Sequence, residues 1–253
     1  MKITIFQYSP LWCDKILNIE KIVNILDSIN LKTDILVFPE MTLTGFTMDS
    51  SKHSEKLDGL SFAFFSQLAK RERINVLSGI IFEERKKYFN SLFHFGKDGK
   101  IISGYKKIHP FSPSGENLYY TAGNKPVISK YRNFTFGLSI CYDLRFPELF
   151  RFYGKKRCDV IFCIANWPER RIEQWKILLQ ARAIENQCFV VGVNRNGRDQ
   201  LYYYPGCSAV VDPMGNFLFL AAEKENFSTI DLDLKLVKSI REKLPFLKDI
   251  KLI

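Results

Sequence analysis

The stretch Phe134-Thr-Phe-Gly-Leu-Ser-Ile-Cys141-Tyr-Asp-Leu-Arg-Phe-Pro147 decides the fold, because a single cysteine joins an apolar strand to a helix. Residues 134–140 combine aromatic and β-branched side chains, which predicts a buried strand. Residues 147–154 have apolar side chains at helical spacing and begin with proline, which predicts a helix. At such a turn we expect free backbone N–H groups and a helix dipole to lower the thiol pKa and to offer donors to an oxyanion. Position alone fits a plain buried cysteine equally well.

The composition is that of a globular chain: 253 residues, of which 46% are hydrophobic and 25% charged. No linker or low-complexity stretch divides it, so residues 1–253 are predicted to form one domain. There is no run of about 18 apolar residues, so no membrane span is expected. The N-terminus lacks the pattern of a secretion signal, which makes the cytoplasm the expected location.

The patterns of cysteine, histidine and charged residues exclude several classes of function. Six cysteines without C-x-x-C spacing are expected to be reduced thiols, and three isolated histidines predict no metal centre. The formal net charge is +10, but the basic residues form short clusters without interleaved aromatic residues. We therefore expect no nucleic-acid partner and no membrane.

Strands and helices alternate in two similar rounds along the chain. A strand, a helix and the strand beginning at Asp34 resemble a second strand, helix and strand beginning at Asp159. Two such βαβ units predict two sheets packed face to face with helices outside, an α/β fold with four α-β-β-α layers. The predicted strands are 2–7, 34–38, 74–83, 89–96, 101–106, 134–140, 159–164, 189–194, a hairpin within 207–222 and 227–232. The predicted helices are 15–29, 61–72, 147–154, 172–185 and 234–243.

Four segments could place reactive groups in one pocket at the strand ends. Glu40 follows the short strand 34–38, and Lys107 follows the strand 101–106. Glu116 lies in a loop after them, and Cys141 occupies the turn described above. Any one of these charged residues alone is more simply explained as a surface or loop charge.

Together the four segments resemble the nitrilase superfamily of carbon–nitrogen hydrolases. The resemblance covers nearly the whole chain and extends to further segments in the same order. These are Ala165-Asn-Trp-Pro168, Trp175, Ala181-Arg-Ala-Ile-Glu-Asn-Gln187, Val193-Asn-Arg195, Gly206-Cys-Ser208 and Asp212-Pro-Met-Gly215. It implies the nitrilase-type sandwich, a catalytic triad of Glu40, Lys107 and Cys141, and Glu116 as a second glutamate near the triad.

The chemistry of amide hydrolysis agrees with these implied roles. A thiolate at Cys141 would form a thioester acyl-enzyme. The Lys107 ammonium and the backbone N–H of Tyr142 would hold the oxyanion, and Glu40 would move protons between thiol, ammonia and water. Glu116 would hold Lys107 in place, and a lysine between two carboxylates should stay cationic. The reaction that the resemblance implies takes a small-molecule amide substrate and requires no metal or organic cofactor.

Within the superfamily, the chain looks most like the ω-amidases, which act on 2-oxoglutaramate and 2-oxosuccinamate. The resemblance is carried by Pro39–Met48, Gly115–Asn124 and Cys141–Glu148. Arg171 is a candidate for binding the distal carboxylate, although an exposed arginine at a helix start would be equally ordinary. The remaining substrate-binding candidates, Trp167 and Phe46, could wall a small pocket or belong to the core.

Other activities on the same triad stay open. They are an amidase for deaminated glutathione, an N-carbamoyl amino acid hydrolase and an aliphatic amidase; a non-catalytic binding protein on this fold is a further alternative. The resemblance implies at least a homodimer, formed through the helices after the cysteine turn and around Trp175. Arg145 and Arg182 are predicted to be structural, tying these two helices together or bridging subunits.

Overall fold

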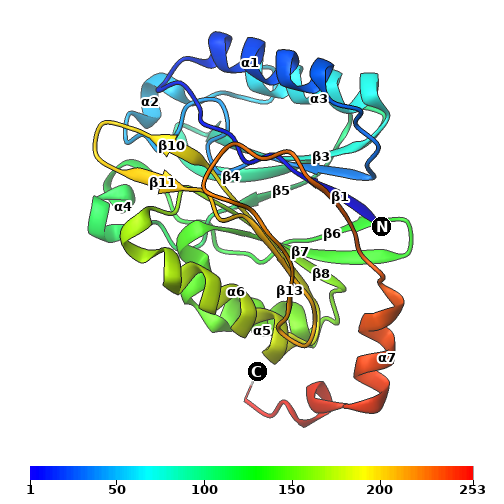
Figure 1. Cartoon of the computed structure of the whole chain (residues 1–253). Helices are drawn as coiled ribbons and strands as arrows, with labels where there is room; N and C mark the ends of the chain where they lie inside the picture. The colour runs from blue at the N-terminus through cyan, green and yellow to red at the C-terminus, as the bar shows by residue number, and fades with distance from the viewer. Residues whose placement is uncertain (253) are drawn as a thin grey trace.

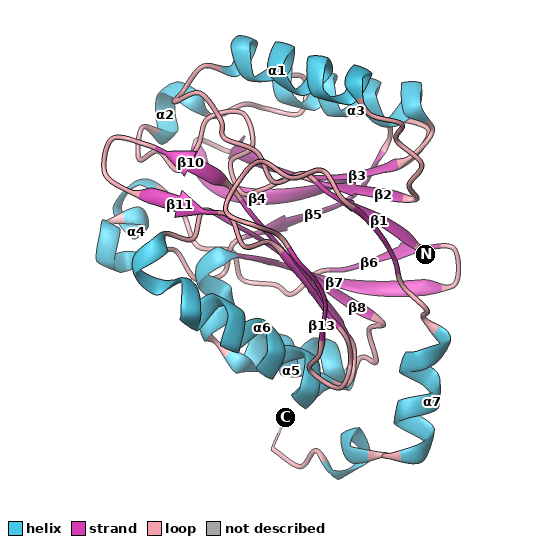
Figure 2. Cartoon of the chain, in the orientation of Figure 1, coloured by secondary structure: helices cyan, strands magenta, loops and turns pink. Residues whose placement is uncertain are grey.

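Two six-stranded mixed sheets packed face to face make up the centre of the molecule, and helices cover both outer sides (Figure 1, Figure 2). This computed structural model describes residues 1–252. The predicted four-layer α-β-β-α sandwich is confirmed. The turn that begins at Cys141 lies at one end of the space between the sheets, where strands of both sheets end.

Sheet 1 has the strand order β14-β1-β2-β3-β4-β5. Its strands are β1 (Lys2–Ile5), β2 (Ile35–Val37), β3 (Asn75–Glu84), β4 (Lys87–Phe95), β5 (Ile101–Lys106) and β14 (Thr229–Asp231). The strands β1, β2 and β3 are parallel, whereas β4, β5 and β14 run antiparallel to their neighbours. The predicted hairpin at 97–100 joins β4 to β5, and Gly99 adopts the positive φ of 82° that this turn requires.

Sheet 2 repeats this arrangement with the order β13-β12-β9-β8-β7-β6. Its strands are β6 (Ile128–Tyr131), β7 (Phe134–Ile140), β8 (Val160–Ala165), β9 (Phe189–Asn194), β12 (Ala209–Val211) and β13 (Phe217–Leu220). Here β7, β8 and β9 are parallel, and the other three are antiparallel to their neighbours. The two βαβ units predicted from the sequence are therefore confirmed.

The helices form the two outer layers. In Figure 1, α1 (Lys15–Ser28) and α3 (Leu60–Glu72) cover sheet 1, while α5 (Pro147–Lys155) and α6 (Ile172–Asn186) cover sheet 2. The side chain of Asp14 caps α1 by accepting a hydrogen bond from the backbone of Leu17 at 3.0 Å. Proline occupies the first position of α5, where its missing N–H costs nothing. The C-terminal α7 (Lys235–Lys243) packs beside the sandwich.

The core lies mainly between the two sheets and continues beneath the helices. Side chains such as Ile5 and Val37 of sheet 1 pack with Leu138 and Ile164 of sheet 2, and all four are fully buried. A second cluster under α1 and α3 is rich in phenylalanine. No helix within residues 1–252 is long and apolar enough to cross a membrane. All six cysteines are free thiols.

One polar contact crosses between the sheets within this core. His94 on β4 is fully buried; its Nδ1 lies 2.7 Å from the hydroxyl of Ser129 on β6, and its Nε2 lies 3.0 Å from Oδ1 of Asn75. Burial lowers the pKa of His94 to about 4. The imidazole is therefore neutral in the folded protein at neutral pH.

Several short elements were not predicted from the sequence. They are β6, α2 (Ser50–His53), α4 (Glu116–Tyr119), and the two strands of a separate ribbon, β10 (Asn196–Arg198) and β11 (Tyr203–Pro205). Each spans three or four residues, too few for a hydrophobic period to be recognised. The predicted loop around Glu116 is thus partly a single helical turn.

Candidate active site

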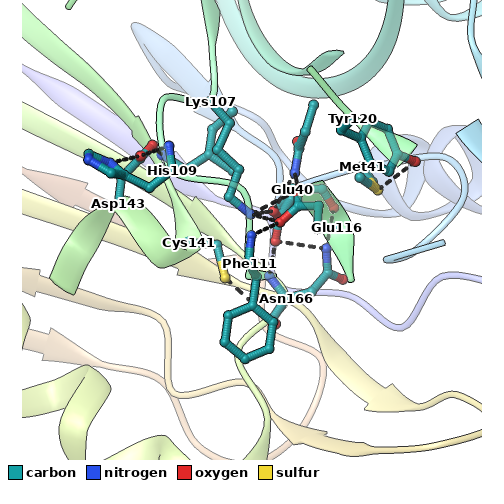
Figure 3. A network of polar contacts seen from close by, with 12 residues as sticks. Glu40, Met41, Lys107, His109, Phe111, Glu116, Tyr120, Cys141, Asp143 and Asn166 are labelled. Atoms are coloured by element: carbon teal, nitrogen blue, oxygen red, sulfur yellow. Dashed lines mark hydrogen bonds and ion pairs between the residues drawn. The ribbon is translucent and has the colours of Figure 1, made fainter. Parts of the chain in front are cut away.

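The four residues predicted from separate segments meet at one end of the sandwich (Figure 3). Glu40 lies three residues after β2, Lys107 directly after β5, Glu116 at the start of α4, and Cys141 directly after β7. Because β2 and β7 belong to different sheets, this meeting depends on the face-to-face packing. Sheet 1 supplies Glu40 and Lys107, whereas sheet 2 supplies the cysteine.

Lys107 lies between the two glutamates and is only 1% exposed. Its Nζ is 2.9 Å from Oε1 of Glu40 and 2.8 Å from Oε2 of Glu116. Burial by itself would lower the lysine pKa, but the two carboxylates outweigh burial and hold this pKa well above its usual value. This is the direction of shift expected from the sequence for a lysine between two carboxylates. The ring of Phe46 lies 5.4 Å from the same Nζ.

Glu40 and Glu116 are both held by several hydrogen-bond donors. The amide nitrogen of Asn90 donates to Oε1 of Glu40 at 2.7 Å and to Oε1 of Glu116 at 2.8 Å. The backbone N–H of Asn166 donates to Oε2 of Glu40 at 2.8 Å. Burial raises the pKa of Glu116, Lys107 opposes this increase, and Glu40 adds to it. The two carboxylates are therefore fixed in one orientation relative to Lys107.

Cys141 adopts a left-handed backbone conformation with φ 48°. A non-glycine residue is rarely found in this region, and such strain is concentrated at functional sites. The side chain is partly exposed, and Sγ lies 3.8 Å from the carbonyl oxygen of Asn166. The strained turn therefore presents the thiol at the surface of a cavity rather than inside the core.

The predicted lowering of the Cys141 pKa is wrong. Burial and the nearby carboxylate of Glu40 raise the pKa of this thiol well above its usual value, and Lys107 only partly compensates. A 3₁₀ turn, Cys141–Arg145, follows the strand, so α5 begins only at Pro147 and its dipole is distant from the sulfur. The resting group is a thiol that needs a base, and Glu40 is the adjacent candidate.

A buried aspartate fixes the backbone of this turn. Asp143 is fully buried and accepts hydrogen bonds from the backbone N–H of Ile140 at 2.9 Å and from the hydroxyl of Tyr105 at 2.8 Å. It also contacts Nδ1 of His109 at 2.8 Å. Because His109 lies two residues after Lys107, this network ties the lysine segment to the cysteine turn.

A pocket opens directly over Cys141. It is a small cleft whose lining includes Cys141 itself. All four substrate-binding candidates line it: Phe46, Tyr142, Trp167 and Arg171. Its remaining lining residues are Phe111, Ser114, Arg145, Asn166, Pro168, Tyr202 and Tyr204. Within residues 1–252, no group of three or more metal-binding side chains is arranged to hold an ion.

Residues 2–242 match the family model of the carbon-nitrogen hydrolases. The chain belongs to this family. It is therefore a hydrolase that acts on carbon–nitrogen bonds in amides, as its amidase relatives also indicate.

Two relatives and one solved structure resemble this carbon–nitrogen hydrolase over almost its full length. The 2-oxoglutaramate amidase of Bacillus subtilis strain 168 is 32% identical over 236 residues, covering 92% of this chain and 91% of the relative. The omega-amidase YafV of Escherichia coli K12 is 33% identical over 253 residues, covering 98% and 96%. The structure of XC1258 from Xanthomonas campestris, a superfamily protein with an arsenic adduct in its active site, superposes with a TM-score of 0.95 at 30% identity, covering 100% and 98%.

The two arginines predicted to be structural in this hydrolase do join the helical segments. Arg145 donates to the side chain of Gln174 at 2.6 Å, and Arg182 donates twice to the carbonyl of Leu144, at 3.1 and 2.7 Å. Arg145 also makes a contact that the sequence did not predict. Its guanidinium lies 5.0 Å from the ring of Trp167 and lines the pocket.

Sequence reasoning missed the two asparagines that hold the glutamates. Asn166 lies in the segment Ala165–Pro168, which was noted for its resemblance but assigned no role. Asn90 is a polar residue in the predicted buried strand 89–96, which also holds Ser91 and His94, and its 2% exposure shows that it faces inward. A polar residue in a predicted buried strand is the sequence signal that could have identified Asn90, because a buried polar side chain needs a hydrogen-bond partner.

Proposed function

We propose that this hydrolase is an ω-amidase that converts 2-oxo dicarboxylic acid monoamides, such as 2-oxoglutaramate and 2-oxosuccinamate, to the 2-oxo acid and ammonia. The observation that carries the proposal is the meeting of the Glu40–Lys107–Glu116 cluster with Cys141 (Figure 3), which lines a pocket that has arginines on its wall. The names of the relatives from Bacillus subtilis and Escherichia coli support the same substrate class.

In the acylation half of the proposed reaction, Glu40 takes the proton of the Cys141 thiol as sulfur attacks the amide carbon. The Lys107 ammonium stabilises the resulting oxyanion together with the backbone N–H of Tyr142, and one such donor is typically worth about 3–4 kcal/mol. Glu40 then passes its proton to the departing nitrogen. The carbon–nitrogen bond breaks, ammonia leaves, and a thioester remains on Cys141.

In the deacylation half, water replaces ammonia beside Glu40. The carboxylate removes a proton from this water as its oxygen attacks the thioester carbon. The carbon–sulfur bond breaks and the proton returns to sulfur, which regenerates the thiol. Glu116 keeps Lys107 in place throughout, so the oxyanion site does not need to reorganise between the two halves.

Arg171 is proposed to bind the distal carboxylate of the substrate. Its guanidinium lies 5.0 Å from the ring of Phe111 and lines the pocket. Among the described residues, neither Arg171 nor Arg145 forms an ion pair with an acidic side chain. A cation without an acidic partner beside a largely aromatic pocket favours an anionic substrate.

The proposal is tested by measuring ammonia release from 2-oxoglutaramate, 2-oxosuccinamate, deaminated glutathione, an N-carbamoyl amino acid and a neutral aliphatic amide. We expect the highest kcat/KM for the two 2-oxo acid amides. Release of carbon dioxide from the carbamoyl compound, or preference for deaminated glutathione or the neutral amide, would reassign the substrate. No turnover of any amide would support a non-catalytic role.

We also propose that the chain forms at least a homodimer through the surface of α5 and α6. Ile177 and Ile184 support this assignment, because these apolar side chains of α6 are 63% and 52% exposed. Light scattering at micromolar concentration is expected to give at least twice the monomer mass. A monomer under these conditions would contradict the proposal.

A further inference from the structure

Asn90 connects the two buried glutamates through a single amide group. It lies on β4, is 2% exposed, and donates one N–H to Glu40 and the other to Glu116. Both hydrogens of its NH₂ group are therefore used on carboxylates. Hydrogen bonds to an ionised acceptor are among the strong ones in proteins.

The orientation of this amide follows from its surroundings. Oδ1 of Asn90 is buried and has no hydrogen-bond partner within residues 1–252. Turning the amide over would satisfy neither side, because Oδ1 would then face two carboxylate oxygens. The protein leaves one acceptor unpaired so that both donors reach the glutamates.

The two oxygens of Glu40 consequently have different environments. Oε1 accepts from Asn90 at 2.7 Å and from Lys107 at 2.9 Å. Oε2 accepts from the backbone N–H of Asn166 at 2.8 Å, while its second donor, Nδ2 of the same asparagine, is 3.3 Å away. Of the two oxygens, only Oε2 therefore has a long, weak second hydrogen bond, which leaves one of its lone pairs weakly occupied.

Asn166 contacts both the thiol and Oε2. Asn166, which holds Oε2, also accepts from Sγ of Cys141 through its carbonyl oxygen at 3.8 Å. Figure 3 shows Asn166 next to both Cys141 and Glu40. The proton of the resting thiol thus points toward the residue that borders the weakly occupied oxygen.

We propose that Asn90 is a positioning residue that, together with Lys107, keeps Oε1 of Glu40 occupied and so makes Oε2 the oxygen that receives the Cys141 proton. In this step the S–H bond breaks, an O–H bond forms on Oε2, and the electron pair stays on sulfur as the thiolate. The inference rests on the proposed role of Glu40 as the base, and it adds a residue outside the triad and second glutamate.

Other titratable groups also face Glu40. Lys107 and Glu116 contact the same hydrogen-bond cluster, and Cys141 and Cys163 approach from sheet 2. Tyr120, at the end of α4, is buried beside both glutamates. None of these is altered when Asn90 is replaced, so a changed pH profile would report the loss of its two donors.

The test is the rate at which iodoacetamide alkylates Cys141, followed by mass spectrometry as a function of pH. This readout needs no knowledge of the natural substrate. Asn90→Ala should slow alkylation about ten- to hundredfold, as expected for the loss of hydrogen bonds to a charged group. In this variant the acid limb of the profile, the range over which the alkylation rate falls as the pH is lowered, should move up by about one pH unit. The reason is that the carboxylates lose donors that favour their ionised form.

Two further variants separate positioning from folding. Asn75→Ala removes another buried asparagine of sheet 1, one that contacts His94 instead of the glutamates, and should leave the acid limb in place. Asn90→Leu keeps a similar side-chain volume and adds no charge but donates no hydrogen bond, so it should show the same upward shift and serves if Asn90→Ala does not fold. An unchanged acid limb in the folded Asn90 variants would overturn the inference. Absence of any acid limb in the wild type would instead overturn the role of Glu40 as base.

Discussion

Five successive strands are connected alike in the two sheets, yet the sheets supply different chemistry. Strands β1, β2 and β3 of sheet 1 correspond in order and direction to β7, β8 and β9 of sheet 2. Glu40 follows β2, while Asn166 follows its counterpart β8. Lys107 follows β5, whereas the counterpart β13 is followed by Ala221. The segments that follow corresponding strands therefore carry charged residues in sheet 1 and neutral residues in sheet 2.

This difference divides the proposed reaction between the sheets. Sheet 1 holds the ionised groups, each 1% exposed or less, in a closed hydrogen-bonded cluster. Sheet 2 presents the sulfur on a strained turn and, with the segments that follow its strands, most of the pocket wall. The repeated fold supplies rigid strand ends, and the residues placed there decide the function. Changes in either half should therefore have distinguishable effects.

The largest effect is expected when sheet 2 loses its nucleophile. Cys141→Ala should lower kcat by at least about 10⁴-fold, because no other group can form the thioester. The charged cluster of sheet 1 stays intact, so the free energy of unfolding should change little. Ammonia release and urea unfolding measure the two effects. Cys158→Ala, a buried cysteine outside the pocket, serves as control, and comparable loss in both variants would argue against a special role for Cys141.

Removing the cation of sheet 1 should cost stability as well as activity. Lys107→Met leaves two buried carboxylates without a counter-charge and should lower the free energy of unfolding by about 3–5 kcal/mol at neutral pH. Urea unfolding is the measurement. Lys100→Met, which removes an exposed lysine 3.8 Å from Asp98, should cost less than about 1 kcal/mol. Equal losses in the two variants would contradict the account of the cluster.

The contact between the sheets should make stability depend on pH. His94 has a folded-state pKa of about 4, against 6.5 for an ordinary histidine, so the unfolded chain binds the proton first as pH falls. Above about pH 6.5, His94 makes its full contribution of about 3 kcal/mol to the free energy of unfolding. This contribution is lost as the pH falls to about 4. Urea unfolding across this range, compared with His94→Gln, measures it. A slope that persists unchanged in the variant would assign the effect to other groups.

The smallest effect concerns the pocket wall next to sheet 2. Arg171→Ala should raise KM for 2-oxoglutaramate about tenfold through loss of a charge-assisted hydrogen bond. The kcat/KM for a neutral aliphatic amide should not change. Arg170→Ala is the matched control, because Arg170 is exposed and does not line the pocket. A similar loss for both amides would show that Arg171 shapes the pocket without binding a carboxylate.

The layers could be predicted because their signals are local, whereas the catalytic candidates were identified by the resemblance of four separate segments to the nitrilase superfamily. The apolar run before Cys141, the proline of α5 and the Asp-Gly turn each act within a few residues. Properties that depend on distant neighbours could not be predicted in this way. Burial and Glu40, which lies on the other sheet, reverse the expected pKa shift of Cys141. The role of Asn90 depends on two glutamates that only the folded chain brings to it.

The central claim is that Cys141 becomes acylated by a 2-oxo acid amide while the cluster of sheet 1 moves the protons. The most direct test is to mix the protein with 2-oxoglutaramate, stop the reaction with acid, and measure the mass of the intact chain and its peptides. The account predicts an increase equal to the substrate minus ammonia, located on the peptide containing Cys141 and absent in Cys141→Ala. Turnover without this adduct, or an adduct on another residue, would contradict it.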